Sequence, residues 1–162
     1  MGLRATGAWR VGLRVGAGAA ARGETSVEVC FCYGCASRAT VVLGDERLDE
    51  VAALFADVVD AVAEREAISR AVAALYRIAG EQSPIRADRA GNFSDGGVDG
   101  RMDCIDHATT TTRFLVLIEA RGCLRFHRVP APARRWRVLF RHNSAVPEEP
   151  EPGPHPPEVA AG

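Results

Sequence analysis

The sequence predicts an α+β fold: an N-terminal β-hairpin, two to three helices, and a cysteine-bearing helix packed on a small antiparallel sheet. Three observations support this: apolar residues alternate over 27–31, recur at helical spacing over 48–79, and follow a capping residue at Asp103. The 162 residues are 47% hydrophobic, enough for one core that needs neither metals nor disulfides. We therefore expect a single domain over residues 26–146.

The hairpin is predicted by a period of two. Val27, Val29 and Phe31 alternate with an acid and two cysteines, as expected for a half-buried strand. Tyr33-Gly34 is a plausible turn, and residues 38–43 are predicted to form the returning strand.

Two helices are predicted next. Asp45 is expected to cap the first, whose apolar residues run at helical spacing from Leu48 to Val59. The second is expected from about Asp60 to Ala79, with Gly80 as its stop. Residues 81–101 are rich in Gly, Asp and Asn, which predicts a long loop, and loops of this length in compact domains usually carry function.

A further helix is predicted from Cys104 to Arg121, with Asp103 as its N-cap and Gly122 as its stop. Strands are expected at 124–129 and 137–146, and these would form the small sheet that follows the cysteine-bearing helix.

The two ends of the chain differ from its middle. Residues 1–25 are predicted to be disordered or a degenerate export segment, and the Pro- and Glu-rich residues 147–162 a disordered tail. We expect a soluble bacterial protein with no membrane span, since no apolar stretch approaches about 20 residues. The net charge of −1 offers no general attraction for nucleic acid, and no specific nucleic-acid partner is predicted. The compartment, cytoplasmic or exported, and the oligomeric state stay open.

Cys104 is the candidate nucleophile, because the dipole of a helix start stabilises a thiolate there. His142, near the end of a predicted strand, is the preferred general base. Asp103, His107 and His127 are possible supporting residues: His107 shares a helix face with Cys104, and His127 competes as the base. The alternative for Cys104 is a buried small hydrophobic residue.

Three further cysteines lie close together. Cys30, Cys32 and Cys35 suggest half of a metal site, a Cys30–Cys35 disulfide across the turn, or three inert thiols. The spacing differs from that of zinc ribbons and fingers, so neither a metal site nor a cofactor is predicted.

Several stretches resemble an uncharacterised bacterial protein family. They are Gly100 to Asp106 (GRMDCID), the Thr-rich helix after it, His142 to Val146 (HNSAV), Val29 to Cys35 (VCF with YGC) and Gly91 to Phe93. The resemblance covers roughly residues 27–146. The wider pattern is similar to the transglutaminase-like and papain-like cysteine superfamily, in which a Cys at a helix start and a His on a strand act on amides.

The resemblance implies a cysteine-dependent amide hydrolase or acyltransferase, with Cys104 as nucleophile and His142 as base, acting on an unknown peptide or amide. Backbone N–H groups at the helix start would stabilise the oxyanion. The superfamily also has an Asp or Asn on the strand after the His. The residues after Val146 offer no such strand, so an active chain would need this group from elsewhere. The alternative is a non-catalytic binding or structural domain of the same fold.

Overall fold

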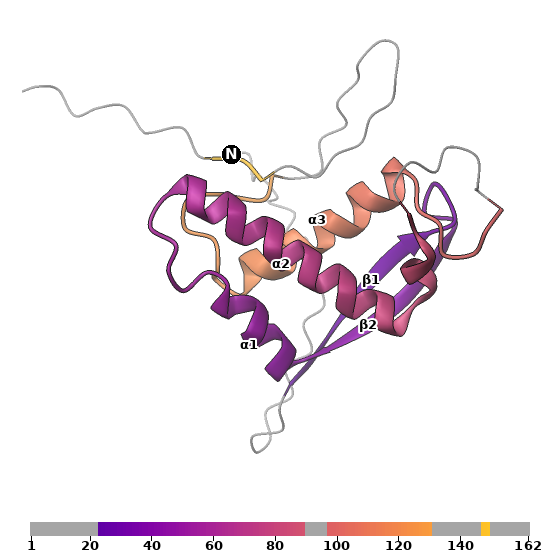
Figure 1. The fold of residues 1–162 in the computed structure, drawn as a ribbon, viewed down its shortest axis with the longest axis horizontal. Coiled ribbons are helices and arrows are strands. Elements are labelled where there is room, and N and C mark those ends of the chain that lie inside the picture. The colour runs from indigo at the N-terminus through magenta and orange to yellow at the C-terminus, as the bar shows by residue number, and fades with distance from the viewer. Residues whose placement is uncertain (1–22, 90–96, 131–146, 150–162) are drawn as a thin grey trace, which may run out of the picture.

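The computed structural model describes residues 23–89, 97–130 and 147–149. Its elements are β1 (Glu24–Phe31), β2 (Ser37–Gly44), α1 (Asp45–Ala53), α2 (Ala61–Gln82), the 3₁₀ helix η1 (Pro84–Ala87) and α3 (Cys104–Ala120) (Figure 1). A two-stranded antiparallel sheet combined with helices confirms the predicted α+β class. None of these helices is long and apolar enough to cross a membrane.

The hairpin forms as the alternation predicts. β1 and β2 pair antiparallel, with Val27 opposite Val41 and Val29 opposite Ala39. Val29 and Val41 are fully buried, whereas Val42, on the other face of β2, is exposed. The pleat therefore directs one apolar face of the hairpin into the core.

The first predicted helix is shorter than expected. Gly44, not Asp45, holds the N-cap position, and Asp45 is the first helical residue. The helix ends at Ala53, so Val59, which was expected on its apolar face, is exposed. Asp45 instead forms an ion pair with Arg121, beyond the end of α3, at 3.1 Å.

The second helix is longer than expected. Asp60 caps it by accepting a hydrogen bond from the N–H of Ala63 at 2.7 Å, close to the predicted start. The prediction that Gly80 ends the helix is wrong, because α2 continues to Gln82. Gly80 is buried, and a Cβ there would lie 3.4 Å from the Cβ of Arg86 in η1. Gly80 therefore lies in the contact between α2 and η1.

The predicted bounds of α3 are nearly correct. Asp103 is the N-cap, Arg121 is the C-cap, and Gly122 has φ +71°, as expected for a residue that ends a helix. The helix lies along β1, where the hydroxyl of Thr110 accepts a hydrogen bond from the N–H of Cys30 at 3.0 Å. A helix therefore covers an edge of the hairpin that would otherwise expose unpaired backbone groups.

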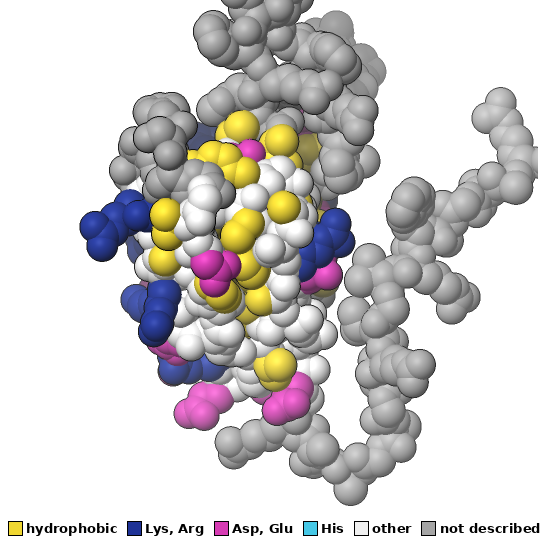
Figure 2. All heavy atoms as spheres, turned by 90° about the vertical axis from the view of Figure 1, so that its right-hand side faces the viewer, with side chains coloured by type: hydrophobic (Ala, Val, Ile, Leu, Met, Phe, Trp, Pro, Cys, Tyr) yellow, Lys and Arg dark blue, Asp and Glu magenta, His cyan; other side chains and the backbone are white. Residues whose placement is uncertain are grey.

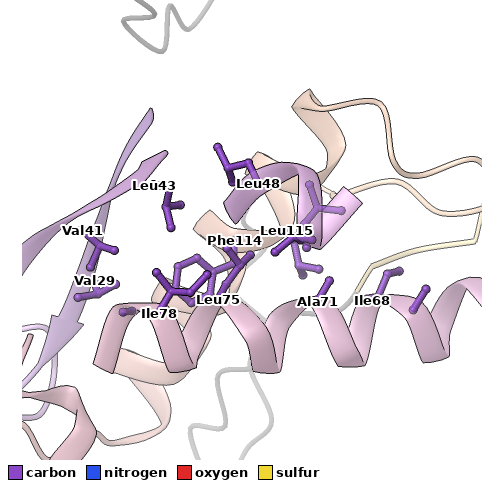
Figure 3. Packing of buried hydrophobic residues seen from close by; sticks show 14 of the residues in the cluster. Val29, Val41, Leu43, Leu48, Ile68, Ala71, Leu75, Ile78, Phe114 and Leu115 are labelled. Carbon is purple, nitrogen blue, oxygen red and sulfur yellow. The ribbon is translucent and has the colours of Figure 1, made fainter. Parts of the chain in front are cut away.

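One core joins the sheet and the helices. Figure 3 shows side chains from the hairpin, α1, α2 and α3 meeting between the elements, with Phe114 and Leu75 near the centre. Phe114, Leu75, Val41 and Leu43 are among the fully buried residues, which together place the core between α2, α3 and the inner face of the hairpin.

Residues 124–129 do not form the predicted strand. Within the described part of the chain they make only an isolated bridge, between Arg128 and Glu148. The N–H groups of Arg125, Phe126 and His127 all donate to the carboxylate of Glu64, at 2.6–2.9 Å. Three consecutive N–H groups pointing to one side are incompatible with a strand, in which they alternate. The predicted strand at 137–146 lies outside the described residues.

Residues just outside the predicted domain, 26–146, also take part in the structure. β1 begins at Glu24, inside the segment expected to be disordered or a degenerate export segment. Glu148, expected in a disordered tail, exchanges two backbone hydrogen bonds with Arg128, at 2.7 and 2.8 Å. Glu149 forms an ion pair with Arg65 of α2 at 3.2 Å.

Candidate functional site

Cys104 is the first residue of α3, as the sequence predicts, and it is half-buried with a reduced thiol. Asp103 accepts hydrogen bonds from the N–H groups of Ile105 and Asp106 at 3.0 and 2.9 Å. Asp106 in turn accepts from the N–H of Asp103 at 3.1 Å, which completes a capping box. The predicted supporting residue Asp103 therefore fixes the start of the helix. Two N–H groups expected to stabilise an oxyanion are already bonded to it.

The β1–β2 turn holds the same two carboxylates. The N–H groups of Tyr33 and Cys35 donate to Asp106 at 2.8 and 2.5 Å, and that of Gly34 donates to Asp103 at 3.0 Å. The four residues 32–35 all have φ between 61° and 67°, a left-handed conformation that only glycine adopts without strain. The turn thus directs its N–H groups at carboxylates about seventy residues later in the chain.

A disulfide between Cys30 and Cys35 closes this turn. Of the possibilities considered for the three neighbouring cysteines, the structure shows the cross-turn disulfide. Cys32 keeps a reduced thiol, 3.5 Å from a carboxylate oxygen of Asp99. Among the described residues no group of three or more His, Cys, Asp and Glu side chains could hold a metal ion.

Residues 99–102 pack between the turn and η1. The N–H of Cys32 donates to the carbonyl of Arg101 at 2.7 Å, and that of Met102 donates to Asp88 at 2.9 Å. Gly100 has φ +82°, and a Cβ there would overlap the carbonyl of Pro84. Figure 2 views this end of the molecule, where hydrophobic side chains lie between arginines on both sides.

His107 lies on the first turns of α3, as predicted, and interacts with two other segments. Its Nε2 is 2.9 Å from a carboxylate oxygen of Asp88, and its Nδ1 is 3.5 Å from the hydroxyl of Tyr76 in α2. The Tyr76 hydroxyl also lies 3.0 Å from that of Thr111. Burial, together with the charges of Asp88 and Asp106, raises the pKa of Tyr76 to about 12, so this hydroxyl remains protonated at neutral pH.

The surroundings of the helix start are acidic. Burial raises the pKa of Asp106, and the negative charge of Asp103 raises it further. The hydrogen bonds that Asp106 accepts from the backbone lower the pKa, but by less. Asp88 adds a third carboxylate nearby. Three carboxylates therefore lie around the start of α3, the end of the helix where the dipole favours negative charge.

His127 is not placed to act as a base for Cys104. Its ring Nδ1 lies 2.8 Å from Glu64, and both side chains are buried. Glu64 precedes Tyr76 by 12 residues on α2, which is about 18 Å along the helix axis. Tyr76 contacts His107 near the start of α3. Because Glu64 lies at the other end of α2 from Tyr76, its partner His127 packs far from the start of α3. In the structure His127 is the buried partner of Glu64.

Glu64 was not singled out from the sequence. Burial alone would raise the pKa of Glu64, but hydrogen bonds from three backbone N–H groups and from His127 outweigh burial and lower it. The sequence does contain a signal, because Glu64 falls on the same helical stripe as Ile68, Ala71 and Leu75. An acid on an apolar stripe indicates a buried partner.

The preferred base, His142, lies outside the described residues, as do Gly91 to Phe93 and the segment from His142 to Val146. Asp88 was also not predicted, and nothing in its loop distinguished it from the other acids. Comparison with known proteins found no matching family model, curated protein or solved structure.

Proposed function

We propose that the protein is a cysteine-dependent amide hydrolase or acyltransferase with Cys104 as its nucleophile. The supporting observation is the place of Cys104 at the first position of a 17-residue helix, at the positive end of the helix dipole. The capping box, the β1–β2 turn and the loop before the helix all hold this position. A fixed nucleophile is what orientation-dependent catalysis requires.

In the proposed reaction the Cys104 thiolate attacks the carbonyl carbon of an amide, and an imidazolium donates its proton to the leaving amine. The acyl group then passes from sulfur to water in a hydrolase, or to an amine in a transferase. His142 is the proposed imidazole, through the sequence resemblance. The His107–Asp88 pair is a second source, because His107 is three residues after Cys104 on the same helix face.

One observation favours the alternative, a non-catalytic binding or structural domain. The carboxylates of Asp88, Asp103 and Asp106 surround the helix start, and Asp103 occupies the N–H groups of Ile105 and Asp106. An acyl transferase of this fold would therefore need its oxyanion donors from other groups.

The test is acylation by p-nitrophenyl acetate, an activated ester, followed by peptide mass mapping. We expect one equivalent of p-nitrophenolate in a rapid phase and an acetyl group on Cys104. Cys104→Ala abolishes both, and removing the base slows acylation by about 100-fold or more. Comparing His142→Ala with His107→Ala identifies the base.

The matched control is Cys123→Ala. Burial raises the pKa of the Cys123 thiol, against a smaller opposing effect of Arg121, so Cys123 contributes little thiolate at neutral pH. Its replacement should leave acylation unchanged. The proposal is contradicted if Cys104→Ala is acetylated as fast as the unsubstituted protein. It is also contradicted if both histidine variants are acetylated as fast as the unsubstituted protein.

A further inference from the structure

The Cys30–Cys35 disulfide has two unlike ends. Cys30 is fully buried in β1, covered by α3, whereas Cys35 lies in the turn and is half-buried. A thiolate that attacks a disulfide must reach one sulfur while the other departs. The difference in burial therefore directs attack to Cys35 and makes Cys30 the leaving group.

A guanidinium lies where that leaving group would form. Nη1 of Arg113 is 3.4 Å from the sulfur of Cys30 and donates to the carbonyl of Glu28 at 3.0 Å. Nη2 of Arg113 pairs with the carboxylate of Glu28 at 2.9 Å, and Arg38 pairs with the same carboxylate at 3.2 Å. Two guanidinium groups and one carboxylate therefore lie on the Cys30 side of the disulfide.

We propose that the Cys30–Cys35 disulfide is a thiol-exchange site, attacked at Cys35 by an external thiol, with Arg113 stabilising the Cys30 thiolate that leaves. The substrate class is a low-molecular-weight or protein thiol. This site is independent of the reaction proposed for Cys104.

The exchange balances as follows. The external thiolate forms a bond to the Cys35 sulfur, the Cys30–Cys35 bond breaks, and its electron pair passes to Cys30. The product is a mixed disulfide at Cys35 and a thiolate at Cys30, beside Arg113. A second external thiol then displaces Cys35 from the mixed disulfide, so two thiols are oxidised to one disulfide and the protein is reduced. A lower leaving-group pKa speeds the first step, which is the contribution expected of Arg113.

The experiment follows reduction of the folded protein by glutathione, with rapid quenching by N-ethylmaleimide and peptide mass mapping. It uses the Cys32→Ala variant, so that the neighbouring thiol of Cys32 cannot exchange with the mixed disulfide. Before reduction, the denatured unsubstituted protein should have three of its five cysteines open to alkylation, and the denatured Cys32→Ala variant two of its four; after reduction all should react. We expect glutathione on Cys35 and N-ethylmaleimide on Cys30.

The role of Arg113 is tested by rate. Arg113→Gln should slow the first step by about three- to tenfold. Arg38→Gln is the matched control, since it removes a partner of Glu28 but not the guanidinium in contact with sulfur, and its effect should be smaller. Unchanged circular dichroism shows that each variant remains folded.

Three outcomes overturn the proposal: glutathione on Cys30, equal rates for Arg113→Gln and Arg38→Gln, or five alkylated cysteines before reduction. If Arg113→Gln fails to fold, the position of the glutathione in the Cys32→Ala variant alone decides the direction of attack.

Discussion

The carboxylate of Asp106 accepts a hydrogen bond at 2.8 Å from the N–H of Tyr33, which lies 73 residues earlier in the chain. Its other oxygen accepts from Cys35 of the same turn. One side chain therefore joins the cap of α3 to the β1–β2 turn. The turn and the helix start are a single structural unit, and a change in one should be felt in the other.

Replacing Asp106 tests this unit. Asp106→Asn keeps one acceptor oxygen but turns an NH₂ group toward backbone donors, so we expect a loss of about 2–3 kcal/mol in the free energy of unfolding. Urea denaturation measures it, with Asp49→Asn as a control, because Asp49 is exposed and pairs with Arg121 at the long distance of 3.9 Å. Equal stability of the two variants would show that the turn and the helix are not coupled.

Gly100 should tolerate no side chain. Gly100→Ala places a Cβ on the carbonyl of Pro84 at a residue with φ +82°, and we expect a loss of about 2 kcal/mol or more. Gly122→Ala is the control for backbone conformation alone, because Gly122 has φ +71° but open space around it. Thermal unfolding of both variants separates the two effects, and an equal loss in both would argue against the overlap.

Glu64 should make stability depend on pH. Its folded-state pKa is lowered, so its contribution is complete above the unfolded pKa of about 4.5 and is lost as pH falls through the lower folded value. Glu64→Gln should cost about 2–4 kcal/mol at neutral pH and progressively less as the pH falls through the folded-state pKa, where the native carboxylate becomes protonated. Urea denaturation across this range measures the difference. A loss that does not vary with pH would mean that the charge of Glu64 contributes nothing.

Breaking the disulfide should loosen the start of α3. The disulfide closes a short loop, with a sequence separation of 5, so removing the disulfide should lower the free energy of unfolding by about 2 kcal/mol. The amide hydrogens of four residues should exchange faster, and by more than the change in global stability accounts for. These residues are Tyr33, Cys35, Ile105 and Asp106. The comparison is between oxidised protein and the Cys30→Ala/Cys35→Ala variant, and amides in the middle of α2 serve as the internal reference. Exchange that changes uniformly across the chain would contradict local coupling.

The sequence predicted the elements whose signals are local. The alternation around Val29 and the cap at Asp103 depend on nearby residues, and both are confirmed. Other features depend on distant groups. Gly80 lies inside α2 with Arg86 of η1 packed over it, and the N–H groups of residues 125–127 bind Glu64 instead of a neighbouring strand.

The candidate site divides in the same way. The place of Cys104 at a helix start follows from the neighbouring Asp103, so it could be predicted. The contact of His107 with Asp88 depends on how the loop after η1 packs, and no local pattern indicates it. The burial of His127 depends on Glu64, an acid on another helix. The pairing of Cys104 with His142 stays a prediction.

The left-handed turn has a consequence for the order of events during synthesis. The N–H group of Tyr33 leaves the ribosome 73 residues before the carboxylate that it binds. At roughly 5–20 residues per second, this is a delay of about 4–15 s. Until Asp106 has been synthesised, water must solvate the N–H groups of the β1–β2 turn, and the carboxylate that stabilises the strained turn conformation is missing. The nascent hairpin is thus expected to acquire its final bend only when the helix that begins at Cys104 emerges.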